Sequence, residues 1–371
     1  MIFKAITYGW MYFLVTFLQL SGNWLAGGMS QGSQTVPAIF VFGDSLVDVG
    51  NTNFLRSLAK ANYYPYGIDS PRGPSGRFCN GKTMVDIIDE MLGLPNPPAY
   101  TDPSTRGNRI LGGVNYASAA GGILDETGRH LGQRFSLSQQ VLNFQSTLNQ
   151  IRNMMYGPEI ISKYLAKSIV ILNLGSNDYI NNYLLPPIYN TSYIYNPQQF
   201  ANLLINGYTR QILRLHSLGL RKMFIAGIGP LGCIPNQRAF WQSPPDRCVD
   251  FVNQMLGSFN EGLRLLVDRL NGNHPGAIFV YGNSYAALGD ILNTPQRYGF
   301  TVVDRACCEI WRNRGQITCT PFTIPCSNRI QSVFWDAFHP TEAANAWLAK
   351  RAFSGPRSDC YPINIQQMSL L

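Results

Sequence analysis

Charged residues are scarce in this 371-residue chain. Asp, Glu, Lys and Arg make up 13% of it, against 45% hydrophobic residues, and the formal net charge is +8. The basic residues are scattered rather than gathered in a run, which excludes a basic arm for binding nucleic acid. The apolar content is ample for a globular core, and the length suits one large domain or two ordinary ones.

Long apolar runs are absent beyond the N-terminus, so we expect no later segment to cross a bilayer. At the N-terminus, Lys4 precedes an almost wholly apolar stretch, Ala5 to Leu20, and the small residues Ala26-Gly27-Gly28 follow. This order is typical of a secretory signal peptide, and we expect residues 1–28 to be removed. An uncleaved anchor is the alternative, but the run is short for a membrane span. The sequence therefore predicts a secreted, extracellular protein with no stable membrane anchor after cleavage.

Cysteine pairs of the C-x-x-C type are also absent, which argues against a metal site. The eight cysteines are an even number, which in a secreted protein suggests disulfides. Cys233 and Cys248 are the easiest local pair. Two of the cysteines in the next loop are also expected to pair, and the candidates are Cys307, Cys308, Cys319 and Cys326. The sequon Asn190-Thr191-Ser192 predicts glycosylation of Asn190.

Short apolar segments alternate with amphipathic ones along the rest of the chain. We expect strands at Ala38–Phe42, Leu111–Ala117, Ser168–Leu174, Lys222–Ile228 and Ala277–Tyr281, and helices at Thr83–Leu92, Ser138–Met155, Pro197–Leu218, Gln254–Leu270, Tyr285–Leu292 and Thr341–Phe353. This alternation predicts an α/β fold with one parallel sheet and helices on both faces. No linker or internal repeat is visible, so we expect a single domain over residues 29–371 with long loop insertions, including a cysteine-bearing loop over 301–329.

Polar or small residues follow three of the predicted strands. Asp44-Ser45 comes after the first, Gly121-Gly122 after the second and Asn177 after the third. Open α/β sheets bind ligands at the carboxyl ends of their strands. Ser45 is therefore a candidate nucleophile, although Asp and Ser are also good helix N-caps and a capping role is the alternative for this motif alone.

Histidine is rare, and only one of the four has an acid at useful spacing. His339 follows Asp336 by three residues, and one tight turn can aim the carboxylate at one ring nitrogen and leave the other free as a base. The alternative is that His339-Pro340 simply opens the last helix. Combined with Ser45, a glycine backbone and Asn177, the pair gives a nucleophile, a base with its orienting acid, and hydrogen-bond donors. Acyl transfer through a covalent ester needs this set.

A second motif, Gly227 to Gly232, matches the G-x-G-x-x-G pattern of dinucleotide sites. Such a site needs a helix that opens directly after the motif. Pro230 and Pro235 disfavour that helix, and no acidic residue ends a following strand at the right distance. We therefore expect no nucleotide cofactor.

The motifs together closely resemble the plant GDSL-motif esterases/lipases of the SGNH hydrolase superfamily, and the resemblance runs from Phe40 to about Phe353. It rests on four blocks in order, which are FGDSL with DVGN (42–51), GVNYASAAGG (113–122), GSND (175–178) and DAFHPTEAAN (336–345). The segment Cys233-Ile234-Pro235 and the adjacent Cys307-Cys308 are also similar to this family.

The resemblance implies a flavodoxin-like, three-layer α/β/α sandwich, and it implies a Ser45–His339–Asp336 catalytic triad. The family usually has proline where this chain has Ala337, between acid and base, and this departure could loosen their turn. The G-x-S-x-G elbow of α/β-hydrolases is absent.

The resemblance also implies an oxyanion hole, made by the backbone N–H of Ser45, the side chain of Asn177 and a glycine N–H. The glycine is Gly122 or, as the alternative, Gly121. No metal or organic cofactor is implied.

We therefore expect a secreted carboxylic-ester hydrolase acting in lipid metabolism at the cell wall or apoplast. Its ester substrate is open between a lipid, a cutin-like polyester, an acetylated polysaccharide and a phenolic ester, because one fold hosts many substrates. The alternatives are an acyltransferase that uses the same acyl-enzyme, and a non-catalytic protein that binds wall polymer or lipid.

Overall fold

The computed structural model of this protein describes residues 36–244, 247–308 and 318–371. The predicted signal peptide, residues 1–28, lies outside these ranges. The main sheet has the strand order β2-β1-β3-β4-β5-β8. Its strands are β1 (Ile39–Gly43), β2 (Gly113–Asn115), β3 (Ile169–Asn173), β4 (Lys222–Ala226), β5 (Ile278–Gly282) and β8 (Cys360–Tyr361). Strands β1 to β5 pair in parallel, which confirms the predicted α/β class.

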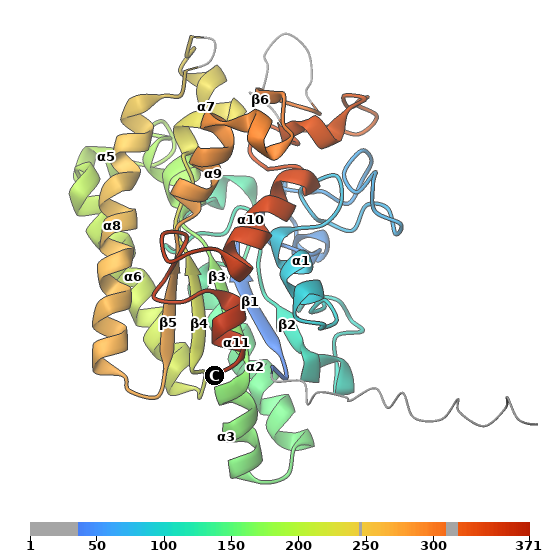
Figure 1. Cartoon of the computed structure of the whole chain (residues 1–371), viewed down its shortest axis with the longest axis vertical. Helices are drawn as coiled ribbons and strands as arrows, with labels where there is room; N and C mark the ends of the chain where they lie inside the picture. The colour runs from blue at the N-terminus through green and yellow to red at the C-terminus, as the bar shows by residue number, and fades with distance from the viewer. Residues whose placement is uncertain (1–35, 245–246, 309–317) are drawn as a thin grey trace, which may run out of the picture. The chain divides into compact units, whose positions relative to one another are not determined.

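The two faces of this sheet carry separate hydrophobic layers, because successive side chains of a strand point to opposite sides. Phe40 and Phe42 pack toward α2, α6 and α8, while Ile39 and Val41 pack toward α1, α10 and α11 (Figure 1). Burial on both faces explains why the strands read as unbroken apolar runs. The helices are α1 (Met84–Met91), α2 (Leu137–Met154), α3 (Pro158–Lys167), α6 (Pro197–Ser217), α8 (Asp250–Asn273), α9 (Ser284–Asn293), α10 (Glu342–Ser354) and α11 (Ile365–Ser369), with the shorter α5 (Thr191–Ile194) and α7 (Pro235–Phe240).

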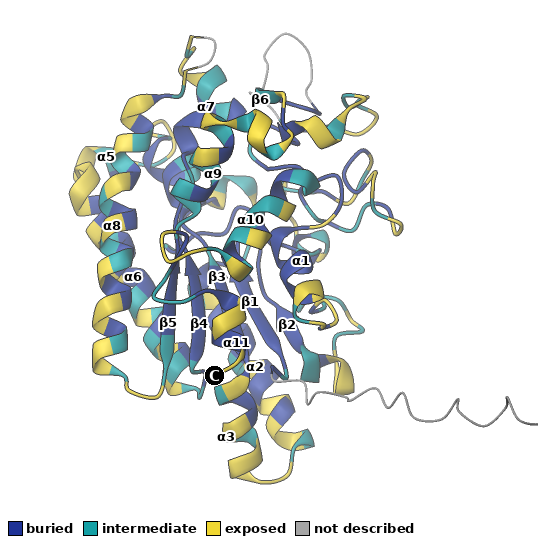
Figure 2. Ribbon diagram, in the orientation of Figure 1, coloured by how far each residue is buried: buried dark blue, intermediate teal, exposed yellow. Residues whose placement is uncertain are grey.

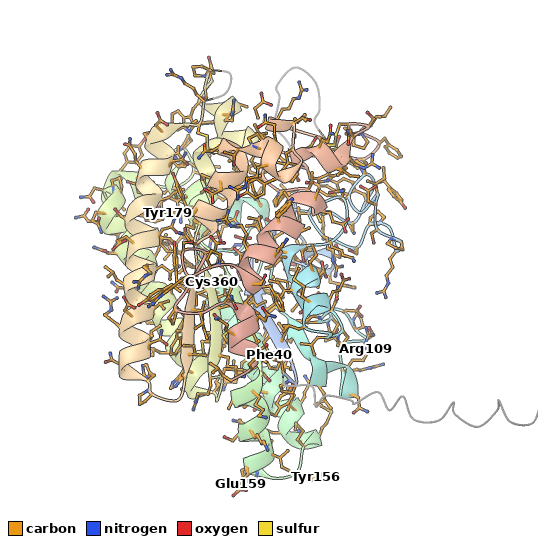
Figure 3. The ribbon with its side chains drawn as sticks, in the orientation of Figure 1. Phe40, Arg109, Tyr156, Glu159, Tyr179 and Cys360 are labelled. Carbon is orange, nitrogen blue, oxygen red and sulfur yellow. A yellow bond between two sulfur atoms is a disulfide. The ribbon has the colours of Figure 1, made fainter. Side chains whose placement is uncertain are left out.

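The strands form the buried layer and the helices expose their outer faces (Figure 2). Phe40 lies within the sheet layer in Figure 3. The three-layer α/β/α sandwich implied by the resemblance is confirmed.

Several elements differ from the sequence-based expectation. Helix α2 begins after Ser136 rather than at Ser138, and α8 extends past both ends of the predicted Gln254–Leu270. Helix α3 is not among the predicted helices, and only Tyr164 and Leu165 of it are buried. Edge strand β8 is also missed, since it has only two residues and pairs antiparallel with β5.

A small second sheet joins the beginning of the predicted cysteine-bearing loop to the segment that directly follows it. In it, β6 (Val302–Ala306) pairs in parallel with β7 (Ser332–Phe334). Strand β6 contains Asp304 and Arg305 and is mostly half-exposed, so it lacks the apolar run that would have marked it. Strand β7 ends just before Asp336, and this small sheet therefore supports the last segment of the site.

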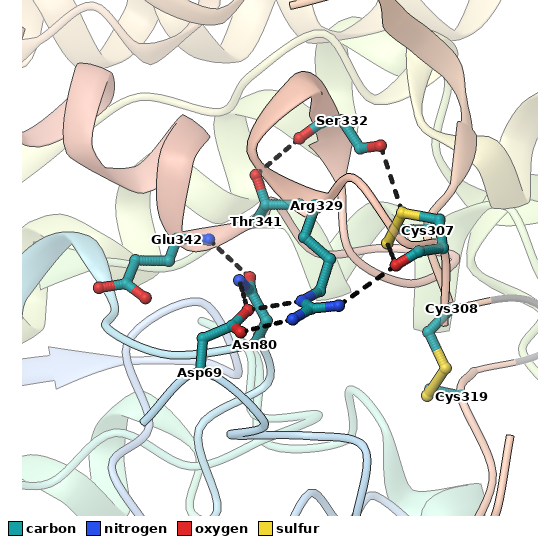
Figure 4. The surroundings of a disulfide bond; sticks show 10 residues. Asp69, Asn80, Cys307, Cys308, Cys319, Arg329, Ser332, Thr341 and Glu342 are labelled. Carbon is teal, nitrogen blue, oxygen red and sulfur yellow. Dashed lines mark hydrogen bonds and ion pairs between the residues drawn. A yellow bond between two sulfur atoms is a disulfide. The ribbon is translucent and has the colours of Figure 1, made fainter. Parts of the chain in front are cut away.

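Three disulfides join neighbouring parts of the chain. The pairs are Cys233–Cys248, Cys307–Cys326 and Cys308–Cys319, so the expected local pair is present and all four cysteines of the next loop are paired. Within the described ranges, Cys79 and Cys360 are buried and free. The guanidinium of Arg329 binds both oxygens of Asp69, which ties the cysteine loop to the loop after β1 (Figure 4).

Among the described residues, no helix combines the length and the apolarity that a membrane crossing requires.

Candidate active site

Ser45 lies in the turn after β1, at the carboxyl edge of the sheet. Gln140 of α2 clamps the end of β1, because its amide accepts from the Gly43 N–H at 2.9 Å and donates to the Gly43 carbonyl at 2.8 Å. The N–H of Asp44 donates to the carbonyl of Asn173, which ties the turn to neighbouring β3. The serine is therefore held on rigid elements of the fold.

A continuous hydrogen-bonded chain joins Ser45, His339 and Asp336. The Oγ of Ser45 lies 2.7 Å from Nε2 of His339, and Nδ1 of the same ring lies 2.7 Å and 2.8 Å from the two carboxylate oxygens of Asp336. Of the motif Asp44-Ser45, only Asp44 makes a cap-type contact, since its Oδ1 accepts from the Leu46 N–H at 3.0 Å, whereas the Ser45 hydroxyl contacts His339. The structure thus brings together residues that are far apart in the sequence.

Asp336 is fully buried, and each of its oxygens accepts several hydrogen bonds. Its Oδ2 accepts from the Tyr66 hydroxyl at 2.6 Å, and its Oδ1 accepts from the N–H groups of Phe338 and His339 at 2.9 Å and 2.8 Å. Burial alone would raise the pKa of Asp336, but the neighbouring His339 and these donors outweigh it and hold that pKa below its ordinary value. Asp336 is therefore kept ionised beside the imidazole.

The turn between acid and base is tight although it contains Ala337 in place of proline. The Trp335 N–H donates to the His339 carbonyl at 2.7 Å, and the N–H of Asn236 donates to the Ala337 carbonyl at 2.8 Å. Ala337 is fully buried. These two bonds tie the turn to its neighbours at the position where the family usually has proline.

Asn177 reaches the same edge of the sheet from the end of β3. Gly175 has a φ of 124°, which favours glycine, and it turns the chain into the one-turn helix α4 (Ser176–Asp178). The Asn177 amide donates one bond to the Gly121 carbonyl at 3.0 Å and accepts one from the Asn181 amide at 2.7 Å. A side-chain amide has two N–H groups, so this contact leaves one free to donate.

The backbone distinguishes Gly121 from Gly122 as a donor. The N–H of Gly121 donates to the Ser118 carbonyl at 3.0 Å. The N–H groups of Gly122 and Ser45 find no acceptor among the described residues. This difference favours Gly122 over Gly121.

Asp178, which the sequence did not single out, holds the segment that carries Gly122. Its carboxylate accepts from the N–H groups of Ile123 and Leu124 at 2.8 Å and 3.0 Å and from the Thr127 hydroxyl at 2.7 Å. A Cβ at Gly122 would lie 2.5 Å from Cγ2 of Thr127, so the packing requires glycine there. Burial raises the pKa of Asp178 to about 6.

A cavity of about 290 Å³ opens beside Ser45 and His339, and its lining is mostly apolar. Asp44 also lines it, but its Oδ2 is buried and has no hydrogen-bond partner among the described residues. Burial raises the pKa of Asp44 to about 7. Ser45, Asn177 and His339 thus border one apolar space.

The other three histidines lie elsewhere. His130 contacts Tyr189, and the tilted rings of His216 and His274 have centroids 4.7 Å apart. Asn190 is exposed just before α5, where a sequon asparagine is accessible. Within the part of the chain that the structure describes, no three His, Cys, Asp or Glu side chains cluster as metal ligands.

Comparison with known proteins agrees with this geometry. The sequence profile of the GDSL-like lipase/acylhydrolase family matches residues 39–352, from β1 to α10. This chain belongs to that family. One GDSL esterase/lipase of Arabidopsis thaliana is 60% identical over 360 residues, which cover 97% of this chain and 96% of the relative. A second from the same plant is 55% identical over 366 residues, covering 97% and 93%. A third, GDSL esterase/lipase 7, is 48% identical over 361 residues, covering 96% and 99%.

The match spans every residue of the site described above, and the predicted plant GDSL esterase/lipase is confirmed. The chain is a carboxylic-ester hydrolase of the GDSL esterase/lipase type.

Proposed function

We propose that this GDSL hydrolase is secreted and cleaves esters through a serine acyl-enzyme. As the Oγ of Ser45 attacks the ester carbonyl carbon, Nε2 of His339 takes the serine proton and the carbonyl electron pair moves to oxygen. The tetrahedral oxyanion then collapses, and the alkoxide leaves with the proton held by His339. Water repeats the sequence on the acyl-enzyme, which frees the carboxylic acid and restores Ser45.

The observation that carries this proposal is the chain of bonds from Asp336 through His339 to Ser45. The 2.7 Å contact between Nε2 and Oγ lies within the range needed for direct proton transfer. Asp336 fixes the tautomer of the imidazole and stabilises its charged form.

The oxyanion is held by backbone and side-chain donors. The N–H groups of Ser45 and Gly122 are unengaged among the described residues, and Asn177 has an N–H to spare. Donors fixed before the reaction cost no reorganisation when charge develops on the oxygen. The nucleophile, base and donors all come from the chain, so this mechanism requires no metal or organic cofactor.

Two further features support an extracellular site of action. The three disulfides are of the kind that persists in an oxidising compartment, and the exposed Asn190 is a suitable glycan acceptor. They accord with the signal-peptide pattern of residues 1–28.

The test combines a serine-reactive probe with a variant. A fluorophosphonate should label wild-type protein at Ser45 alone, and Ser45→Ala should lose both labelling and hydrolysis of p-nitrophenyl butyrate. Ser217→Ala, an exposed serine on α6, is the matched control and should retain both. Labelling at another serine, or hydrolysis that survives Ser45→Ala, contradicts the mechanism. If added alcohol diverted most of the acyl group to a new ester, the protein would be an acyltransferase.

A further inference from the structure

The cavity beside Ser45 is lined by two groups of residues that differ in burial. One group lies on the β4 and β5 side of the sheet and under α9 and α10, and it includes Phe224, Ile234, Ala287, Leu288, Leu348 and Ala352. We call this group the buried arm. The other group consists of Leu58 and Lys60 in the loop after β1, Leu131 in the segment before α2, and Asn181 just after α4. We call it the open arm, because Leu58 is 78% exposed and the other three residues are half-buried, whereas in the buried arm only Leu288 and Leu348 are half-buried and the rest are buried.

The chemistry of the buried arm excludes a charged or strongly polar occupant along most of its length. Its lining is mostly apolar, and the amide of Asn345 within it already donates to the Lys82 carbonyl, so few groups remain to satisfy the hydroxyls of a sugar. At its far end, Arg351 is already paired with Asp359 at 2.5 Å and with Asp290 at 2.7 Å, so its charge is not available to a ligand carboxylate. An unbranched hydrocarbon chain is the occupant that such a lining accepts without leaving polar groups unpaired.

The order of product release indicates whether the acyl group or the alcohol of the ester occupies the buried arm. In the proposed mechanism, on which this inference rests, the alcohol leaves first and the acyl group stays on Ser45 until water arrives. The retained group suits the buried arm, and the departing alcohol and entering water suit the open arm.

We propose that the buried arm binds the acyl chain of the substrate, and that it holds a saturated chain of about eight carbons. Residues Asn345, Leu348 and Ala352 line it from one face of α10. From Asn345 to Ala352 an α-helix rises about 10 Å. An extended chain advances roughly 1.2 Å per bond, which gives about eight bonds over that distance. The preferred substrates are therefore esters of medium-chain fatty acids.

The first measurement is a series of p-nitrophenyl esters from acetate to palmitate. We expect kcat/KM to rise by up to about fourfold per methylene as far as octanoate, because each methylene leaves water for an apolar arm, and then to level or fall. A matched series of acetate esters of longer alcohols should show no such rise. A preference that followed the alcohol rather than the acid would overturn the assignment.

A blocking variant tests the location of the arm. Gly229 lines the cavity, and a Cβ built on it meets its nearest atom, Cδ2 of the buried-arm residue Leu288, at an ordinary 3.5 Å, so the backbone accepts a side chain beside the arm. Gly229→Leu should lower the ratio of octanoate to acetate kcat/KM at least tenfold. Gly289→Leu is the matched control, since a Cβ there meets nothing within 4 Å and the residue does not line the cavity. It should leave the ratio unchanged.

An enlarging variant keeps the test decisive if Gly229→Leu fails to fold. Leu288→Ala should move the optimum to longer acyl chains. If acetate hydrolysis is intact and Ser45-dependent, but neither Gly229→Leu nor Leu288→Ala shifts the chain-length preference, the buried arm is refuted and the proposed function stands. If hydrolysis of every ester is independent of Ser45, the proposed function itself is refuted.

Discussion

Replacing Asn177 by alanine tests the oxyanion hole most directly. The amide has two N–H groups, and one is used by the Gly121 carbonyl, so the variant removes a single donor from the reacting oxygen. That oxygen becomes negative only on the way to the tetrahedral intermediate, so the lost bond is one made mainly in the transition state. We expect kcat to fall about 10²–10³-fold, or roughly 3–4 kcal/mol, with KM little changed.

The same change also costs stability, and the two effects can be separated. It leaves the Gly121 carbonyl and the Asn181 amide without their present partners, at about 1 kcal/mol each. Asn181→Ala is the control, because it removes the bond to the Asn177 oxygen and leaves the donating nitrogen in place. The assay is kcat and KM on a soluble ester beside a thermal melt. If both variants lose a similar small factor in kcat and a similar few degrees in Tm, Asn177 is structural and not an oxyanion donor.

Three other predictions concern carboxylates and their partners. Asp336→Asn should lower kcat about 10⁴-fold, because the amide cannot stabilise the charged imidazole, and a loss under tenfold would mean that another acid orients His339. Tyr66→Phe removes the 2.6 Å donor to Asp336, so the pKa of that carboxyl should rise, and an Asp336 carboxyl signal that titrates at the same pH in both proteins by NMR contradicts this. Burial raises the pKa of Asp44 to about 7 and that of Asp178 to about 6, from the ordinary 3.8 of an Asp carboxyl, so between about pH 4 and 7 the folded state binds more protons than the unfolded state. The contribution of these two groups to stability should fall as pH rises from about 4 to 7, and Asp44→Asn should make the Tm decline less over that window than wild type. Identical Tm profiles for the two proteins would contradict this.

The sequence predicted those parts of the fold and site that rest on local patterns. The apolar runs Ile39–Phe42 and Ile169–Leu172 gave strands β1 and β3, because both faces of each strand are buried and no polar alternation interrupts them. The pair Asp336 and His339 could be found because the two residues share one turn. By contrast, strand β6 was missed, since half-exposed strands leave no apolar run.

The supporting residues could not be predicted, because their partners are remote in the sequence. Tyr66 is 270 residues from the Asp336 oxygen that it binds, and the loop around it contains other tyrosines with no pattern to distinguish one from another. Gln140 faces a similar limit, since it lies on an ordinary amphipathic helix and binds Gly43 97 residues away. Such residues are chosen by the packing of elements, which a local pattern does not encode.

Asp178 shows why the choice between Gly121 and Gly122 needed three dimensions. It directly follows Asn177, and its carboxylate holds the N–H groups of Ile123 and Leu124, 55 and 54 residues away. One buried side chain therefore fixes both the short helix that carries Asn177 and the segment that begins at Gly122. Gly122 follows β2 and Asn177 follows β3, and the Asp178 carboxylate sets the position of one relative to the other. The sequence shows only two separate turns of small residues and gives no sign that they are in contact. In the proposed oxyanion hole, the position of Gly122 relative to Asn177 therefore depends on this buried contact between the two turns.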